Sequence, residues 1–226
     1  MTRSISAPNL AVTVYPRLRE AFKELQAQRR ERSSVAAPLF NLFRVLRLEN
    51  DEVRLHSKLI GHLLDPRGSH GQGALFLDIF LACVTETPAL KSNLPSPLRT
   101  SAWRVSTEKF TIKGNLDIVL DGRADEILCV IENKVWAGEG DKQLSRYRIW
   151  LDLHRRQFSH RLLFFLTPDG REAKTILDDD DYVRLSYSQH VQHWLEQAIP
   201  KIQAAEVRVI AQQYLAIVQH LESHLS

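Results

Sequence analysis

Three charged residues have types and spacings that could hold a divalent cation. Asp117 lies within the apolar run LDIVL, and Glu132 and Lys134 follow the apolar run ILCVI. Glu132 and Lys134 are two residues apart, so on a strand their side chains point to the same face. If the two runs pair as a hairpin, Asp117 comes close to Glu132. Two convergent carboxylates supply the oxygen ligands that magnesium prefers, so the sequence predicts a cation site here.

A simpler interpretation of Glu132 and Lys134 is an ion pair on the surface, at the end of a strand. Taken alone, a Glu-x-Lys triplet is more typical of that arrangement. A carboxylate and an ammonium beside a buried strand are costly, however, unless they are paired or bound to a metal. The acid on the preceding run and a glutamine-bearing helix after Lys134 therefore favour the cation site.

The elements around these residues are predicted to form an antiparallel meander. The segment WRVSTEKFTI at 103–112 alternates like a strand, and a turn at Gly114 and Asn115 leads into LDIVL. A second turn at 121–123 precedes ILCVIENKVW. Two tight turns between three β-rich runs are typical of neighbouring antiparallel strands. The run ILCVI is apolar on both faces, which predicts a central strand covered on each side.

Helices are predicted before and after this meander. Pro16 suits the first turn of a helix over 16–32, the segment 38–48 is apolar on a helical period, and Asn50 or Asp51 suits the N-cap of a helix ending before the turn at 65–68. The remaining predicted elements are an apolar helix at 73–84, a helix from about 141 to 155, strands at 161–166 and 182–187, and helices at 189–199 and 204–223. This order predicts an α/β fold with a mixed sheet flanked by helices, rather than a doubly wound parallel sheet.

Composition restricts the class of protein. The chain has 226 residues, of which 44% are hydrophobic and 25% charged, so a disordered chain and a fibrous protein are excluded. Cys83 and Cys129 lie in apolar runs and are predicted to be buried, reduced thiols. We expect a cytoplasmic protein without a membrane partner, because no apolar stretch reaches eighteen residues. We expect one domain over 1–226, with a helical extension at 1–35.

Positive charge is concentrated after the predicted cation site. The net charge of the chain is +3, but the segment from Lys142 to Arg161 carries six Lys or Arg residues and one acid. Such an excess fits a polyanion ligand, although a solvated helix face is an equally good interpretation. The candidates for contacts with a phosphate backbone are Lys142, Arg146, Arg148 and Arg155.

At this point the sequence resembles the PD-(D/E)XK nuclease superfamily. Asp117, followed after fourteen residues by Glu132-Asn133-Lys134, is similar to its D…E-x-K signature. The resemblance extends to a branch found in bacterial and phage-defence contexts. The phrases that carry it are NLFRVLRLENDEVRLHSKLIGHLLDPRGSHGQG, GNLDIVL, IENKVWAGEGDKQLSRY and LLFFLTPDG. The resemblance implies a restriction-endonuclease-like core with additional N-terminal and C-terminal helices.

The resemblance also implies roles for individual residues. Asp117 and Glu132 would ligate Mg²⁺ or Mn²⁺, with the backbone carbonyl of Asn133 as a third ligand. Lys134 would orient or help deprotonate the attacking water, or stabilise charge on the phosphate. Further residues that match the family pattern are Gln143 in the active site, Glu52 as an additional acid at the metal, and Tyr147 and Glu108 as secondary candidates. His56 is a third secondary candidate, because four residues after Glu52 it would share the same helix face.

Two features depart from the family pattern. Asn115 stands where the family commonly has Arg in a Gly-Arg-x-Asp phrase, which could leave a phosphate or carboxylate contact unmade. The Pro-Asp phrase that gives the superfamily its name is absent, as it is in divergent members.

The implied function is a metal-dependent nuclease acting on nucleic acid, with DNA favoured, in anti-phage defence or restriction. No motif for reading base sequence is present, so we expect weak sequence preference. One alternative is a catalytically silent module of the same fold that binds nucleic acid or a partner protein. Another is a structural partner or homo-oligomer, which an exposed apolar stripe of Leu18, Phe22 and Leu25 would favour.

Overall fold

The computed structural model describes residues 10–37, 40–86, 90, 95, 97–176 and 182–221. The chain divides into two compact units, Met1–Asn41 and Leu42–Ser226. In the first unit, one long helix, α1, spans Leu10–Ala36 and exposes Leu18, Phe22 and Leu25. The predicted helix is therefore present, but its predicted start at Pro16 is wrong: Pro16 lies inside α1. Residues 1–9 of the predicted extension lie outside the described residues.

The second unit contains a five-stranded mixed sheet with the strand order β1-β2-β3-β4-β5. Strands β1 to β3 pair antiparallel, and β3, β4 and β5 pair parallel, so the predicted meander and mixed sheet are confirmed. The strands are β1 (Arg104–Thr111), β2 (Gly114–Gly122), β3 (Ile127–Asn133), β4 (His160–Thr167) and β5 (Val183–Ser186). The first turn falls at Ile112 and Lys113, not at the predicted Gly114 and Asn115, because Gly114 already pairs with Thr111.

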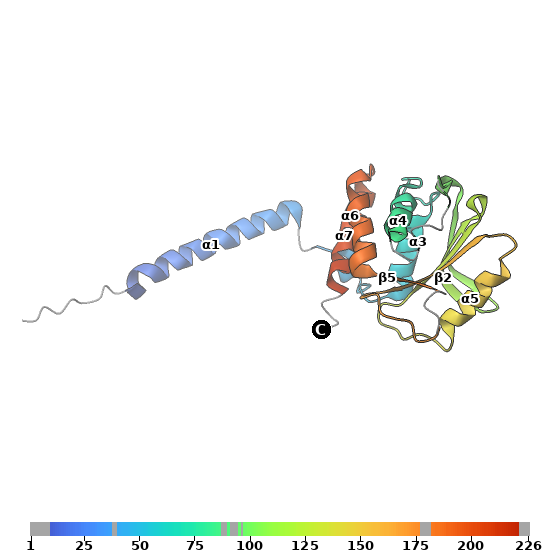
Figure 1. The fold of residues 1–226 in the computed structure, drawn as a ribbon. Coiled ribbons are helices and arrows are strands. Elements are labelled where there is room, and N and C mark those ends of the chain that lie inside the picture. Colours follow the sequence, from blue (N-terminus) through green and yellow to red (C-terminus); the bar gives the residue numbers. More distant parts are fainter. Residues whose placement is uncertain are drawn as a thin grey trace, which may run out of the picture. The chain divides into compact units, whose positions relative to one another are not determined.

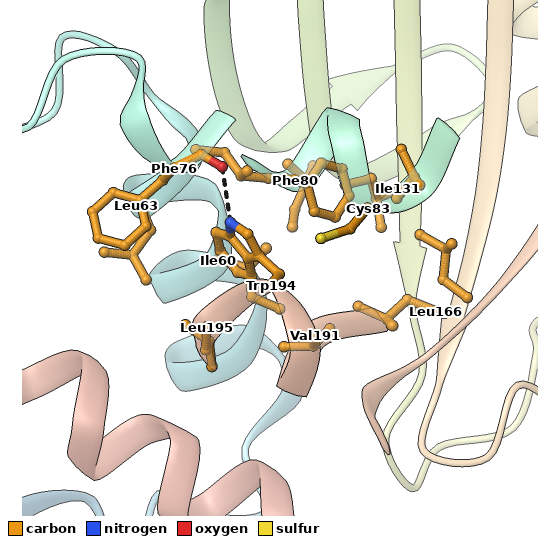
Figure 2. Close-up of a cluster of buried hydrophobic side chains, with 14 of the residues drawn as sticks. Ile60, Leu63, Phe76, Phe80, Cys83, Ile131, Leu166, Val191, Trp194 and Leu195 are labelled. Carbon is orange, nitrogen blue, oxygen red and sulfur yellow. Dashed lines mark hydrogen bonds between the residues drawn. The ribbon is translucent and has the colours of Figure 1, made fainter. Parts of the chain in front are cut away.

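One face of the sheet carries the larger hydrophobic core. Its helices are a π-helical turn (Glu52–Ser57) continuing into α3 (Lys58–Leu64), then α4 (Leu75–Thr85), a π-helical turn (Tyr187–Val191) continuing into α6 (Gln192–Ala198), and α7 (Ala205–Leu221). Figure 2 shows Trp194 between Phe76 and Phe80 of α4. The Trp194 indole N–H donates to the backbone carbonyl of Phe76, which satisfies its one buried polar group. This core fixes α6 against α4.

The opposite face is covered in part by α5 (Gln143–Leu153), which Figure 1 shows on the other side of the sheet from α3 and α4. Leu144, Tyr147 and Leu151 of α5 are buried against the sheet in a second, smaller cluster. Every residue of β3 is buried, which confirms the predicted central strand covered on both faces. Cys83 and Cys129 are buried and unbridged, also as predicted.

The sequence predicts a helix at 38–48, of which 38 and 39 lie outside the described residues; within 40–48, only the single turn α2 (Leu42–Val45) is α-helical. Asp51, one of the two predicted N-caps, accepts a hydrogen bond from the backbone N–H of Arg54 at 2.6 Å. This cap sets the start of the helix that carries Glu52 and His56. Among the described residues, none of the helices combines the length and apolar character needed to cross a membrane.

Candidate functional site

The candidate site lies where β2 and β3 separate. Gly122 pairs with Ile127 at one end of their ladder, and Ile118 pairs with Ile131 at the other. Continued by one residue, this register places Asp117 opposite Glu132. There the backbone N–H of Asn133 donates to Asp117 Oδ2 at 2.8 Å. A carboxylate thus occupies the position at which a ladder would have a backbone carbonyl.

The alternation of β2 side chains also breaks at Asp117. Ile118 and Leu120 pack in the larger core, whereas Leu116 packs with Val119 in the smaller one. Residues 116 and 118 would share a face in a regular strand. The irregularity turns the Asp117 carboxylate toward the end of β3.

Glu132 and Lys134 form a buried ion pair. Lys134 Nζ lies 2.6 Å from Glu132 Oε1, and the two side chains are 12% and 0% exposed. The backbone N–H of Lys134 donates to the carbonyl of Leu166, which extends the β3–β4 pairing past Asn133 and fixes the lysine in place. The interpretation as a surface ion pair is therefore wrong, because Glu132 is fully buried and most of the Lys134 side chain is covered.

The electrostatics of the pair of carboxylates favour a bound cation. Burial raises the pKa of Asp117 to about 6, despite the nearby Lys134. Burial and then the Asp117 charge raise the pKa of Glu132 to about 8. Burial alone would lower the pKa of Lys134, but attraction to Glu132 and Asp117 outweighs it and the pKa is raised.

Glu132 Oε2 is buried and has no hydrogen-bond partner among the described residues. No group of three or more His, Cys, Asp or Glu side chains in the described ranges is arranged to hold a metal. Magnesium, however, is commonly held by one or two carboxylates with waters and substrate phosphates. An unpartnered buried carboxylate oxygen beside a second carboxylate fits such an ion.

Gln143 and Tyr147 reach this site from α5. Gln143 Nε2 donates to Glu132 Oε1 at 2.6 Å and to the Tyr147 hydroxyl at 3.0 Å. The Tyr147 hydroxyl in turn donates to the Asn115 carbonyl on β2 at 2.5 Å. The predicted proximity of Gln143 and Tyr147 is confirmed, since residues four apart share a helix face. Together they connect α5 to the ends of β2 and β3.

Glu108 of β1 lies opposite Asp117 of β2, between the paired residues Thr107–Ile118 and Lys109–Leu116. Its φ of 52° is left-handed, a conformation that costs energy for a residue other than glycine. Glu108 Oε2 accepts from Asn115 Nδ2 at 2.5 Å, while Oε1 is buried without a partner among the described residues. Glu108, Asp117 and Glu132 thus form an acidic row across three strands, and Asn115 binds the first of them.

Glu52 lies near the site but holds a loop. Its Oε1 accepts from the backbone N–H groups of Trp136 and Ala137, each at 2.6 Å. Its charge also contributes to raising the pKa of Lys134. Glu52 therefore positions the segment that directly follows Lys134, and one of its oxygens is already engaged.

His56 does not belong to the site. It is fully buried, and its ring nitrogens contact the Tyr214 hydroxyl and the Glu49 carbonyl, each at 3.0 Å. The prediction was wrong because both polar atoms of the ring are satisfied in the larger core. Burial also lowers the pKa of His56, which favours the neutral ring.

The core around His56 contains a polar chain that the sequence did not reveal. Tyr187 donates from its hydroxyl to Asn133 Oδ1 at 2.7 Å, and Asn133 Nδ2 donates to Ser57 Oγ at 3.0 Å. Tyr214 contacts both Tyr187 and His56. Residues of the larger core thereby hold the side chain of Asn133, which lies between Glu132 and Lys134 in the sequence. The signal available in the sequence was Asn133, a polar residue between Glu132 and Lys134 in the largely apolar segment ILCVIENKVW.

Another contact that sequence reasoning missed holds the loop between β3 and α5. Glu139 accepts from the backbone N–H groups of Lys174 and Thr175 at 3.0 Å, and from Arg171 at 3.0 Å. These bonds lower the pKa of Glu139 although burial acts to raise it. Glu139 therefore fixes the loop from which Gln143 enters α5.

The four basic candidates differ in their surroundings. Lys142 precedes α5 and Arg155 follows it, so the prediction of one basic helix carrying all four was wrong. Arg148 is engaged, because it pairs with Asp152 at 3.0 Å and donates to the Arg161 carbonyl. Lys142, Arg146 and Arg155 are exposed. Arg146 also lies beside Gly114, at the end of the β1–β2 hairpin.

Comparison with known proteins adds one match. A family model described as the PD-(D/E)XK nuclease superfamily matches residues 40–217, which is most of the chain. No curated protein and no solved structure matches the chain. The matched region contains the whole sheet and every residue of the candidate site.

Proposed function

The chain belongs to the PD-(D/E)XK nuclease superfamily, and we propose that it is a metal-dependent nuclease that hydrolyses phosphodiester bonds, with DNA as the favoured substrate. Membership indicates nuclease activity in general, and the mixed sheet flanked by helices is the restriction-endonuclease-like fold of the superfamily. The observation that carries the proposal is the meeting of Asp117, Glu132 and Lys134 in a buried site at the ends of β2 and β3. All three signature side chains are present and converge.

Asp117 and Glu132 would hold Mg²⁺ or Mn²⁺, with the backbone carbonyl of Asn133 as a third ligand. Such an ion lowers the pKa of a bound water and neutralises charge that develops on the phosphate. The protein itself supplies the two carboxylates in fixed positions: the Asn133 N–H orients Asp117, and Gln143 and Lys134 orient Glu132. Fixed ligands require no rearrangement during the reaction.

Lys134 acts through its positive charge. The pKa of Lys134 is raised by its acidic neighbours, so the ammonium form predominates at neutral pH. An ammonium donates hydrogen bonds to water or to a phosphate oxygen and cannot accept a proton. Of the roles implied by the resemblance, orientation of the water and stabilisation of phosphate charge therefore fit this environment better than deprotonation.

The exposed side chains of Lys142 and Arg146 would hold the phosphate backbone beside the site. Both lie at the start of α5, next to Gln143, whose amide contacts Glu132. Contacts between basic side chains and phosphates release counterions, so binding should weaken steeply as salt increases. A role in anti-phage defence or restriction is consistent with the family resemblance.

The test is cleavage of plasmid DNA, single-stranded DNA and RNA in Mg²⁺, in Mn²⁺ and in EDTA. We expect metal-dependent cleavage by the wild type that is lost in Asp117→Asn and Lys134→Ala. Asp121→Asn is the matched control, because Asp121 lies on the same strand at the other end from the site. Cleavage in EDTA, or full activity of both site variants, would refute the mechanism. Nucleic-acid binding without cleavage of any substrate would favour the catalytically silent module.

A further inference from the structure

The end of the β1–β2 hairpin carries two large apolar side chains in water. Phe110 is 87% exposed and Ile112 is 88% exposed, the highest values among the large apolar side chains of the described residues. The two-residue turn consists of Ile112 and Lys113, although such turns usually contain Gly, Asn or Asp. Neither side chain packs in either hydrophobic core. Exposed apolar groups at a loop tip therefore call for a binding explanation.

This hairpin tip, defined as Lys109–Gly114, is attached to the candidate site. Phe110 pairs with Asn115, whose carbonyl accepts the Tyr147 hydroxyl that also contacts Gln143. Phe110 also follows Glu108, in the acidic row, by two residues. At about 3.3 Å per residue, Phe110 lies roughly 7 Å along the strand from that row. This distance corresponds to about two base steps of nucleic acid at 3.4 Å each.

Positively charged residues lie next to the apolar pair along the chain and on the α5 side of the hairpin. Lys109 and Lys113 flank it, and no acidic residue occurs between Lys109 and Gly114. Lys109 Nζ lies 5.3 Å from the centre of the Trp150 ring, which places its ammonium on the α5 side of the hairpin. The Arg146 guanidinium approaches the same end at Gly114. The tip thus combines an aromatic ring with two cations, and a third approaches it from α5.

These features select one class of partner. A second copy of the chain would bring the same lysines against each other, and two apolar side chains are few for an interface of about 800 Å² per partner. A nucleic-acid strand offers bases with apolar faces and an anionic backbone, which is the pattern that an aromatic side chain within positive charge recognises. Bases inside a duplex are stacked on each other, so an outward-pointing ring reaches only an unpaired base.

We propose that the hairpin tip stacks on unpaired bases of a nucleic-acid substrate, with Phe110 as the stacking residue, Ile112 as its apolar neighbour, and Lys109, Lys113 and Arg146 on the flanking phosphates. This inference rests on the proposed nuclease function and gives it a substrate class: single-stranded or locally unpaired nucleic acid. The base contacted lies about two base steps from the bond that is cut.

The test measures binding in EDTA, where no metal-dependent cleavage occurs, by fluorescence anisotropy of labelled single-stranded and duplex DNA. We expect Phe110→Ala to weaken single-strand binding about tenfold, within the range for loss of one base–aromatic stack, and Phe110→Trp to restore it. Val209→Ala, which truncates an exposed apolar side chain on α7, serves as the control and should bind like the wild type. Binding to duplex DNA should be weaker and should change little in any of these variants.

Several results would overturn the inference. One is single-strand binding by Phe110→Ala within twofold of the wild type. Another is equal loss of duplex and single-strand binding. A third is a wild-type dimer in sedimentation that Phe110→Ala converts to monomer, which would make the tip a contact between copies. Because Phe110 is exposed, its variants should keep the wild-type melting temperature, and that measurement accompanies each binding curve.

The same experiment separates this inference from the nuclease proposal when cleavage is measured in parallel. Metal-dependent cleavage by the wild type together with unchanged binding by Phe110→Ala refutes only the stacking role. Binding that depends on Phe110 without cleavage in any metal refutes the nuclease and supports the stacking role. Absence of both binding and cleavage in the wild type refutes both.

Discussion

The two carboxylate oxygens of Glu132 have different surroundings. Oε1 receives hydrogen bonds from Lys134 and Gln143, whereas Oε2 is buried without a partner among the described residues and lies beside Asp117. Two neighbouring buried carboxylates repel each other when both are ionised. The protein keeps them together because the contacts of Lys134, Gln143 and the Asn133 N–H determine their positions. This arrangement has a measurable consequence for stability.

We expect the metal-free protein to lose stability between about pH 5 and pH 8 because of Glu132 and Asp117. Their pKa values are raised to about 8 and about 6 in the folded protein, so the folded state holds protons that the unfolded chain has released. The free energy of unfolding therefore falls as pH rises through this range. Relative to Glu132→Gln, the melting temperature of the wild type in EDTA should fall by about 5 °C or more. Added Mg²⁺ should reverse the loss at high pH.

Comparison of the wild type with Glu132→Gln removes the contribution of histidines to the pH dependence of stability. Burial lowers the pKa of His56, His70 and His190, which makes stability rise with pH, but this effect is common to both proteins. Glu206→Gln, at an exposed position on α7, should follow the wild type. Parallel melting curves for the wild type and Glu132→Gln from pH 5 to pH 8 would contradict the raised pKa values.

At the residue scale, short-range spacing was sufficient to predict part of the site. Asp117, Glu132 and Lys134 could be found because the two-residue period and a short connection fix which residues of neighbouring strands meet. The position of His56 could not be predicted in this way. Its partner Tyr214 is 158 residues away, and no local pattern encodes that contact. The left-handed conformation of Glu108 was equally hidden, because no turn residue or glycine marks it in the sequence.

At the element scale, the end of β3 is held from both faces of the sheet. Gln143 of α5 contacts Glu132 on one side, and Tyr187 and Ser57 contact the Asn133 side chain on the other. Tyr187 begins the π-helical turn before α6, and Ser57 ends the turn before α3. Packing of the larger core therefore determines where β3 ends.

Tyr187→Phe tests this connection. The change removes the hydroxyl that donates to Asn133 Oδ1 and leaves a buried acceptor unpaired, at a cost of about 1–3 kcal/mol. We expect a melting temperature lower by about 5 °C. Well below that temperature, kcat for cleavage should fall about tenfold while KM stays close to that of the wild type, because the substrate-facing surface is unchanged.

The matched control is Tyr182→Phe. Tyr182 is also buried, and its hydroxyl accepts from the Ala173 N–H in the smaller core, away from Asn133. It should lose stability but keep kcat. Equal kcat values for Tyr187→Phe and Tyr182→Phe would mean that the Asn133 side chain has only a structural role.

The order and type of the elements could be predicted further than their ends. Alternation and apolar runs identified all five strands, because side-chain period and burial are properties of the local sequence. The turn was displaced to Ile112 and Lys113, since backbone pairing of Gly114 outweighed the turn preference of Gly-Asn. The segment at 38–48 has an apolar helical period, but its described part, 40–48, forms only α2, and Phe43 packs on Tyr214 of α7. Tertiary contacts determined both differences.

At the scale of the whole molecule, the two compact units differ in where their apolar side chains lie. Both hydrophobic cores consist of residues from Phe43 onward, and the family match begins at residue 40. In the first unit, α1 places Leu18, Phe22 and Leu25 in water, at spacings of four and three residues. Such spacing places them on one helix face, which suits contact with another helix.

We therefore expect that a chain lacking residues 1–36 folds and keeps the candidate site intact. No described side chain of α1 belongs to either core, so the melting temperature of the shortened chain should lie within about 3 °C of that of the full chain, because less than about 1 kcal/mol of stability is lost. Metal-dependent cleavage per molecule should also be retained. Calorimetry and the plasmid assay on the full and shortened chains measure both quantities.

A control that keeps α1 but changes Leu18, Phe22 and Leu25 to Ser separates loss of the apolar stripe from loss of the whole helix. A shortened chain that unfolds at room temperature would mean that α1 completes the core of the second unit. If the shortened chain and the Ser variant fold but lose cleavage together, the stripe would have to bring a second copy or a partner to the site.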